Sequence, residues 1–104
     1  MTRPWRSVRD PYGRRVLFDA RAHLHLAAGD RAHLLERVEL ILATIAWPDL
    51  HEHDPFAGRE RYYRNHVFEP QKWLRVVVDF NCKPAFVVTV VIQDNSPRLQ
   101  RRRR

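Results

Sequence analysis

The residues best suited to chemistry lie in one short stretch, GRERYYR, at positions 58–64. Side chains alternate between the two faces of a β-strand, so Arg59, Arg61 and Tyr63 would share one face. Guanidinium groups suit phosphate oxygens, and a tyrosine ring can stack on a nucleobase. An exposed strand with cross-strand ion pairs would explain the same residues, so the stretch predicts either a phosphate-binding surface or a charged strand.

Histidine is the usual general acid or base near neutral pH, and the chain has six histidines. His25 is our first candidate for proton transfer, although a lone histidine on a short helix can equally serve packing or solubility. His51 and His53 would share one face of a strand, but no third ligand of suitable spacing is visible. We therefore expect no metal. The sequence has no glycine-rich phosphate loop, nucleophile elbow or CxxC pair, and we expect no cofactor.

Thr89 is the one hydroxyl in an otherwise apolar stretch, FVVTVVI at 86–92. A buried hydroxyl needs a hydrogen-bond partner, so Thr89 either bonds to local backbone or faces a polar site. A regular strand would place Val87 and Val91 on its face, and Arg75 on the preceding strand could lie beside them.

Hydrophobic periodicity predicts the elements that position these residues. A repeat of about 3.6 residues predicts a helix over 31–46, with Trp47-Pro48 ending it. A shorter helix is predicted over 20–28, with Gly29 as its C-terminal stop. Alternating, β-branched or aromatic patterns predict strands over 15–18, 49–54, 59–67, 73–80 and 85–93.

This β-α-α-β-β-β-β order predicts an α+β fold, with two N-terminal helices packed on a four-stranded antiparallel sheet. A chain of 104 residues is long enough for one domain. We expect a basic arm over 1–14, a single domain over 15–94 and a basic C-terminal tail over 95–104.

The formal net charge is +7, and the positive charge is concentrated at the two ends. The region between them is slightly acidic. Basic ends favour RNA as a partner, although they could also be solubilising tails. The candidate RNA contacts outside the catalytic set are four arginines: Arg59, Arg75, Arg101 and Arg102.

Two further features indicate where the protein acts. No apolar run is long enough for a membrane-spanning helix, and the N-terminus does not resemble a signal peptide, so we expect no membrane association. Cys82 is the only cysteine, which fits a reducing compartment. The expected location is the cytoplasm.

Five segments in this order resemble the RelE/ParE-like, barnase–EndoU–colicin type of small bacterial and phage ribonuclease toxin domain. They are HL (25–26), ILATIAWPDL (41–50), DPFAGRERYYR (54–64), WLRVVVDF (73–80) and FVVTVVI (86–92). Each segment alone is weak, and their order over about residues 14–94 carries the resemblance.

The resemblance implies a metal-independent endoribonuclease that cleaves RNA by attack of the 2′-hydroxyl. The RNA would be tRNA or ribosome-bound mRNA, and a cognate antitoxin would be a protein partner. The stretch 27–36 lacks the proline that family members carry after the helix histidine and has no histidine at the equivalent place, so either His33 substitutes for it or the site is degenerate. A non-catalytic nucleic-acid- or protein-binding module on the same fold is the alternative. The positions that match the family's catalytic residues are His25, Arg61, Tyr63, Arg64 and Thr89.

Overall fold

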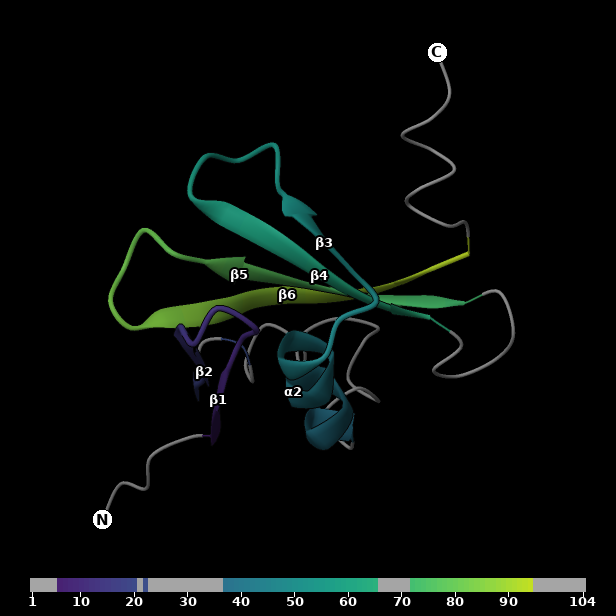
Figure 1. Cartoon of the computed structure of the whole chain (residues 1–104), viewed down its shortest axis with the longest axis horizontal. Coiled ribbons are helices and arrows are strands. Elements are labelled where there is room, and N and C mark those ends of the chain that lie inside the picture. Colours follow the sequence, from purple (N-terminus) through teal and green to yellow (C-terminus); the bar gives the residue numbers. More distant parts are fainter. Residues whose placement is uncertain (1–5, 21, 23–36, 66–71, 95–104) are drawn as a thin grey trace.

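In residues 6–20, 22, 37–65 and 72–94, which the computed structural model describes, the chain forms a six-stranded sheet and one helix (Figure 1). The elements in chain order are β1 (Arg6–Arg9), β2 (Arg15–Phe18), α2 (Val38–Ala46), β3 (Leu50–His53), β4 (Arg59–Asn65), β5 (Trp73–Asp79) and β6 (Ala85–Gln93).

The sheet is mixed, with the spatial order β1-β2-β6-β5-β4-β3. Strand β2 runs parallel to β6, and every other neighbouring pair is antiparallel. Figure 1 shows α2 against one face of the twisted sheet. Strands β1 and β3 are its two edges, so each has one side that no described strand pairs.

The predicted fold class is therefore wrong. Residues 6–9, which we assigned to a basic arm, form a strand that pairs with β2, and β2 in turn joins β6 in parallel. The segment RSVR has a single apolar residue, Val8, so no alternating pattern indicated a strand. Of the two predicted helices, only Val38–Ala46 is described as a helical element; most of the predicted helix 20–28 and residues 31–36 lie outside the described residues.

Local sequence explains the elements that were predicted. Helix α2 buries Ile41, Leu42 and Ile45 on one side and ends before Trp47-Pro48, as expected. The β3–β4 turn is closed by Asp54, whose Oδ2 accepts a hydrogen bond from the Phe56 backbone at 2.9 Å, and by Gly58 at φ +85°.

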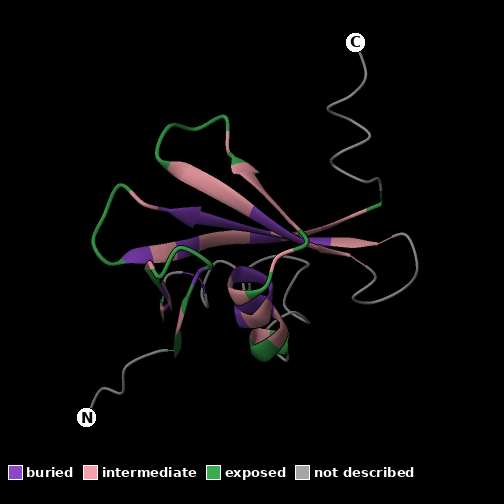
Figure 2. Cartoon of the chain, viewed as in Figure 1, coloured by how far each residue is buried: buried purple, intermediate pink, exposed green. Residues whose placement is uncertain are grey.

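Figure 2 shows buried segments in α2 and in the central strands. The core lies between α2 and the sheet, and its sheet residues come mostly from alternate positions of the strands. They include Val16, Phe18, Tyr62, Leu74, Val76, Val78, Val87 and Val90. The other side of the sheet carries no described helix, and we call it the helix-free face. Register and alternation assign to it Arg9, Arg15, Leu17, Phe86, Arg59, Arg61, Tyr63, Trp73, Arg75, Val77, Thr89 and Val91.

A register shift in the β5–β6 pair changes the predicted surroundings of Thr89. Val78 pairs with Val87, whereas Val77 pairs with Thr89, so Val88 is an extra residue on β6. Val87 therefore faces the core, and Thr89 lies on the opposite face with Val91. The expectation that Thr89 and Val87 share a face is wrong because a bulge interrupts the alternation.

Candidate functional site

Residues 59–64 of the stretch GRERYYR form most of β4, and their side chains alternate between faces as predicted. Arg59, Arg61 and Tyr63 lie on the helix-free face. Tyr62 is in the core below the sheet, and Glu60 and Arg64 lie on the same side as Tyr62. This one strand therefore contributes to two separate polar groups, one on each face.

On the helix-free face, carboxylates neutralise both arginines. The Arg61 Nε donates to the Asp54 Oδ1 at 2.6 Å, and its Nη1 lies 3.8 Å from the Glu52 Oε2. The Arg59 Nε donates to Asp79 at 3.1 Å, and its guanidinium stacks 4.0 Å from the centre of the Phe56 ring. These arginines anchor the β3–β4 turn, which favours the interpretation of a charged strand.

Tyr63 and Arg61 are brought together, as the predicted site requires. The Tyr63 hydroxyl donates to the Glu52 Oε2 at 2.6 Å and accepts from the Arg61 Nη1 at 3.4 Å. The Tyr63 ring is buried and packs edge-on against Trp73 at 6.4 Å. Burial, with the hydrogen bond to Glu52, raises the pKa of the Tyr63 phenol. The hydroxyl, and not the ring face, is the part of Tyr63 that meets polar groups.

Of the other predicted residues, Arg64 and Thr89 lie away from this contact, whereas Arg75 lies directly across from Tyr63 on the same face. Arg64 is on the opposite face, where its Nη1 lies 3.4 Å from the Ala43 carbonyl in α2. Thr89 is two strands from Arg61, with Val77 between them in register. Arg75 pairs with Tyr63 and donates to Gln93 at 3.3 Å. His25, Arg101 and Arg102 lie outside the described residues.

A second polar cluster, on the helix side of β4, was not predicted. Arg14 lies at its centre: Nη2 donates to the Asp10 Oδ2 at 2.7 Å and to the Glu60 Oε1 at 2.6 Å. The Tyr62 hydroxyl donates to the same Asp10 oxygen at 2.7 Å. His51 completes the cluster, with its Nε2 2.7 Å from the Glu60 Oε1. We call Asp10, Arg14, His51, Glu60 and Tyr62 the Arg14 cluster.

The Arg14 cluster keeps its carboxylates ionised. Hydrogen bonds from Arg14 lower the pKa of Glu60 against the opposing effect of burial, and His51 acts in the same direction. Burial alone would raise the pKa of Asp10, but hydrogen bonds from Arg14 and Tyr62 outweigh it and lower that pKa. Burial and the contact with Asp10 raise the pKa of Tyr62.

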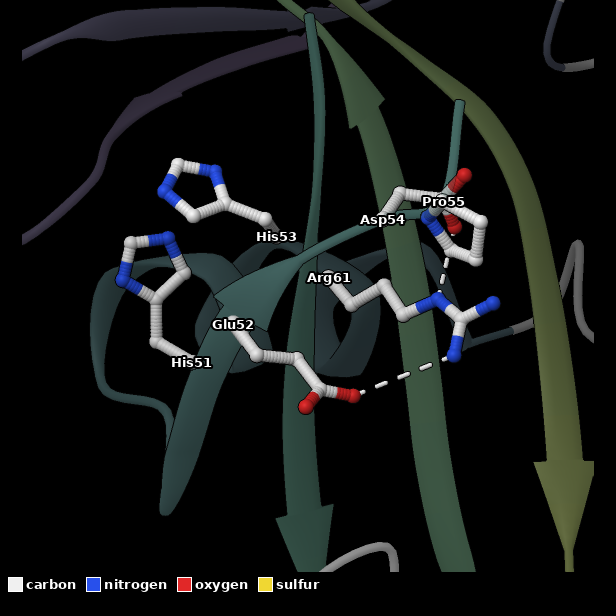
Figure 3. Close-up of a pocket in the computed structure, with 6 residues that line it drawn as sticks. All are labelled: His51, Glu52, His53, Asp54, Pro55 and Arg61. Atoms are coloured by element: carbon white, nitrogen blue, oxygen red, sulfur yellow. Dashed lines mark hydrogen bonds and ion pairs between the residues drawn. The ribbon is translucent and has the colours of Figure 1, made fainter. Parts of the chain in front are cut away.

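One side of the Arg14 cluster is open. A pocket of about 330 Å³ is lined by Tyr12, Arg14, His51, His53 and Glu60. A second hollow, of about 600 Å³, is lined by His51, Glu52, His53, Asp54, Pro55 and Arg61. Because the two share both histidines, they meet around the free edge of β3. Figure 3 shows the two histidine rings side by side on one side of β3, with Glu52 and Arg61 on the other.

Only part of this pocket could be predicted from the sequence. The alternation HEH at 51–53 places both histidines on one face, as predicted, but we considered the pair only as metal ligands and expected no metal because no third ligand was visible. Asp10 and Arg14 were assigned to an arm, so their convergence with β4 was not foreseen. Within residues 6–20, 22, 37–65 and 72–94, no group of three or more His, Cys, Asp or Glu side chains could hold a metal ion.

A basic pair lies at the β1–β2 edge of the helix-free face. Arg9 and Arg15 are direct cross-strand partners, and both are exposed. Neither makes an ion pair with a carboxylate in the described part of the chain; Arg9 donates to the Gly13 carbonyl at 2.8 Å. Like charges directly opposite each other are unfavourable in a sheet, so this pair favours an anionic partner.

The chain matches no protein-family model, no curated protein and no solved structure. No helix among the described residues is long and apolar enough to cross a membrane.

Proposed function

We propose that the protein binds single-stranded RNA along the helix-free face of its sheet. The observation that carries the proposal is the basic pair: Arg9 and Arg15 face each other with no carboxylate partner among the described residues. Anionic phosphates between them would relieve their repulsion.

Beyond the basic pair, the helix-free face carries apolar and aromatic side chains that suit the binding of a single strand. Leu17 of β2 and Phe86 of β6 lie next to each other in register, and Trp73 lies near the other end of β6, opposite Gln93. Phe86 and Gln93 are separated by roughly 23 Å of strand. Sheet faces that combine cations with aromatic rings bind single strands, whose bases can stack on those rings.

Arg75 adds a cation in the middle of this path. Its Nη1 contacts the amide oxygen of Gln93 at 3.3 Å, and its Nε is buried without a hydrogen-bond partner in the part of the chain that the structure describes. A buried donor without a partner is unfavourable, and reorientation of Arg75 toward a phosphate would satisfy it. In the sequence, Asp94 and then the basic stretch 95–104 follow β6.

A second candidate function is metal-independent cleavage of that RNA. It is favoured by the pocket that combines two histidines, Glu60 and Arg14, since these are the residue types that general acid–base catalysis uses. The family resemblance implies the same reaction, although with other residues. An antitoxin partner stays a prediction, because no described surface favours a particular protein.

The test is RNA binding by fluorescence anisotropy, using a labelled 15-nucleotide single-stranded RNA in EDTA across a salt series. Arg15→Ala and Arg75→Ala should each weaken binding and reduce the slope of log K against log salt by roughly 0.7 for each phosphate that is no longer neutralised. Arg6→Ala is the matched control, since it removes the same charge from β1 on the opposite face, where Arg6 pairs with Glu39 at 2.5 Å.

Three outcomes are informative. Weaker binding by Arg15→Ala and Arg75→Ala, with Arg6→Ala near the original affinity, supports the helix-free face. An equal loss in all three variants would mean that net charge alone binds RNA, and it would refute this surface. Absence of binding at low salt would refute the RNA proposal itself.

A further inference from the structure

We propose that His51 and His53 are a general base and a general acid that cleave RNA at the pocket on the edge of β3. This inference rests on the proposal that the chain binds RNA. It assigns catalysis to two residues outside the set that the family resemblance implies.

The first observation is that the two histidines share one opening. Both rings line the 330 Å³ pocket beside Tyr12, Arg14 and Glu60. They are two residues apart on one strand, so their backbone positions are separated by about 7 Å on the same face. A phosphodiester can lie between two groups at this spacing, with one on the side of the attacking oxygen and one on the side of the leaving oxygen.

The second observation is that His51 is held in one orientation. Its Nε2 lies 2.7 Å from the Glu60 Oε1, and its ring stacks on Tyr62 with centres 4.5 Å apart and planes 13° apart. An ionised Glu60 accepts a hydrogen bond, so Nε2 carries the proton and donates it to that contact. The other nitrogen, Nδ1, is then the basic one, and no hydrogen bond to Nδ1 occurs within the described residues. Glu60 is thus a positioning residue that acts through His51.

The third observation is that His53 is exposed on the free edge of the sheet. It makes no hydrogen bond in the described part of the chain, so its ring is accessible to solvent and can be reprotonated after each turnover. The reaction needs one group that accepts a proton and another that donates one, and His51 and His53 would supply these two roles.

The proposed step balances without another reactant. Nδ1 of His51 accepts the proton of the RNA 2′-hydroxyl, and the 2′-oxygen forms a bond to the adjacent phosphorus. The bond from phosphorus to the 5′-oxygen breaks, and protonated His53 gives its proton to that oxygen. The products are a 2′,3′-cyclic phosphate and a 5′-hydroxyl, with no oxidation or reduction.

The charges around the pocket limit its contribution to the affinity for RNA. Asp10, Arg14 and Glu60 together carry one net negative charge, as do Glu52, Asp54 and Arg61 in the adjoining hollow. A phosphate is therefore not attracted to this pocket unless a histidine is protonated, and affinity for RNA must come from the basic residues elsewhere. The histidines should accordingly determine the rate of the bound complex and leave binding nearly unchanged.

The experiment uses the full chain, a 15-nucleotide RNA labelled at its 5′ end, and EDTA throughout. Cleavage is followed on gels that resolve cyclic phosphate ends, and binding is measured separately with the 2′-deoxy oligonucleotide of the same sequence, which cannot undergo the step. The variants are His51→Ala, His51→Asn, His53→Ala and His25→Ala, each checked by circular dichroism and thermal unfolding.

We expect His51→Ala and His53→Ala each to lower the cleavage rate by roughly 10²- to 10⁴-fold with affinity for the deoxy oligonucleotide within about twofold. His51→Asn keeps a polar group of similar shape and should be equally slow, which excludes a packing explanation. The original protein should show a rate that falls on both sides of a pH optimum. His51→Ala should lose the acidic decline and His53→Ala the alkaline one.

Other outcomes separate this inference from the proposed function. Binding without cleavage would overturn the acid–base assignment and leave RNA binding standing. Cleavage that is unchanged in both His51 and His53 variants but lost in His25→Ala would also overturn it, and would place catalysis where the family resemblance implies. Absence of binding would remove the RNA proposal and this inference with it.

Discussion

Glu60→Gln provides the sharpest test of the Arg14 cluster as a structural link. Glu60 accepts hydrogen bonds from the Arg14 Nη1 at 3.0 Å and Nη2 at 2.6 Å, and it contacts His51 at 2.7 Å. Its side chain is 13% exposed. Glutamine has nearly the same shape, but it removes the charge and turns an NH₂ group toward donors.

The expected loss in the free energy of unfolding depends on the contacts that Arg14 keeps in the variant. Breaking a fully buried ion pair costs roughly 3–5 kcal/mol, but Arg14 is 35% exposed and keeps its contact with Asp10. We therefore expect a loss of about 2 kcal/mol in the free energy of unfolding, the value for one or two hydrogen bonds to charged groups. For a domain of this size, that lowers the melting temperature by about 10 °C.

The stabilising contribution of Glu60 should decrease at acidic pH. The pKa of Glu60 in the folded protein lies below 4.5, its ordinary value. Its contribution is therefore complete above pH 4.5 and is lost as the pH falls through the folded pKa. The difference between the original protein and Glu60→Gln should be constant from pH 5 to 7 and should narrow below pH 4.5.

Urea unfolding followed by circular dichroism measures both effects. Glu39→Gln is the matched control, because Glu39 pairs with Arg6 but is 77% exposed, and such a surface pair contributes only about 0–1 kcal/mol. Equal losses for Glu60→Gln and Glu39→Gln, or a difference that does not change between pH 3 and 7, would refute the argument.

Three further predictions follow from the same structure. Gly58→Ala should destabilise the protein by at least about 1 kcal/mol, because Gly58 has φ +85° and a Cβ there would collide with the Asn81 side chain; a melting temperature equal to that of the original protein would contradict this. Tyr62→Phe removes the 2.7 Å hydrogen bond to the buried Asp10 and should lower the free energy of unfolding in urea by about 1–3 kcal/mol. An unchanged free energy of unfolding would mean that Arg14 alone satisfies Asp10. Arg61→Ala leaves Asp54 without its 2.6 Å partner and should raise the pKa of Asp54, which NMR titration of its carboxyl carbon can measure; an unchanged pKa would show that Arg61 does not hold this carboxylate.

Local patterns were sufficient for the central strands and their turns. The strands 15–18 and 85–93 have the predicted bounds, and Trp47-Pro48 ends α2 as expected. These elements depend on side-chain alternation, β-branched content and proline geometry, each of which acts over a few residues.

The sheet topology and the Arg14 cluster depend on contacts that no local pattern contains. Strand β1 has one apolar residue, and only its pairing with β2 makes it a strand. Arg14 and Glu60 are 46 residues apart in the chain, so their ion pair exists only once β2 and β4 lie in one sheet. The bulge at Val88 likewise arises from the β5–β6 pairing and moved Thr89 to the other face.

The charged stretch GRERYYR is explained by the position of β4 next to the edge strand β3. On one face Arg61 holds Asp54 and Glu52, which tie down the β3–β4 turn. On the other face Glu60 and Tyr62 receive Arg14, which ties the β1–β2 turn to the same strand. A short edge strand with few apolar residues cannot be held by burial alone, so ion pairs on both sides of β4 supply the remaining stabilisation. The arginines available to an anionic partner are then those outside these pairs, above all Arg9 and Arg15, and a functional test that mutates only GRERYYR would measure stability before it measured binding.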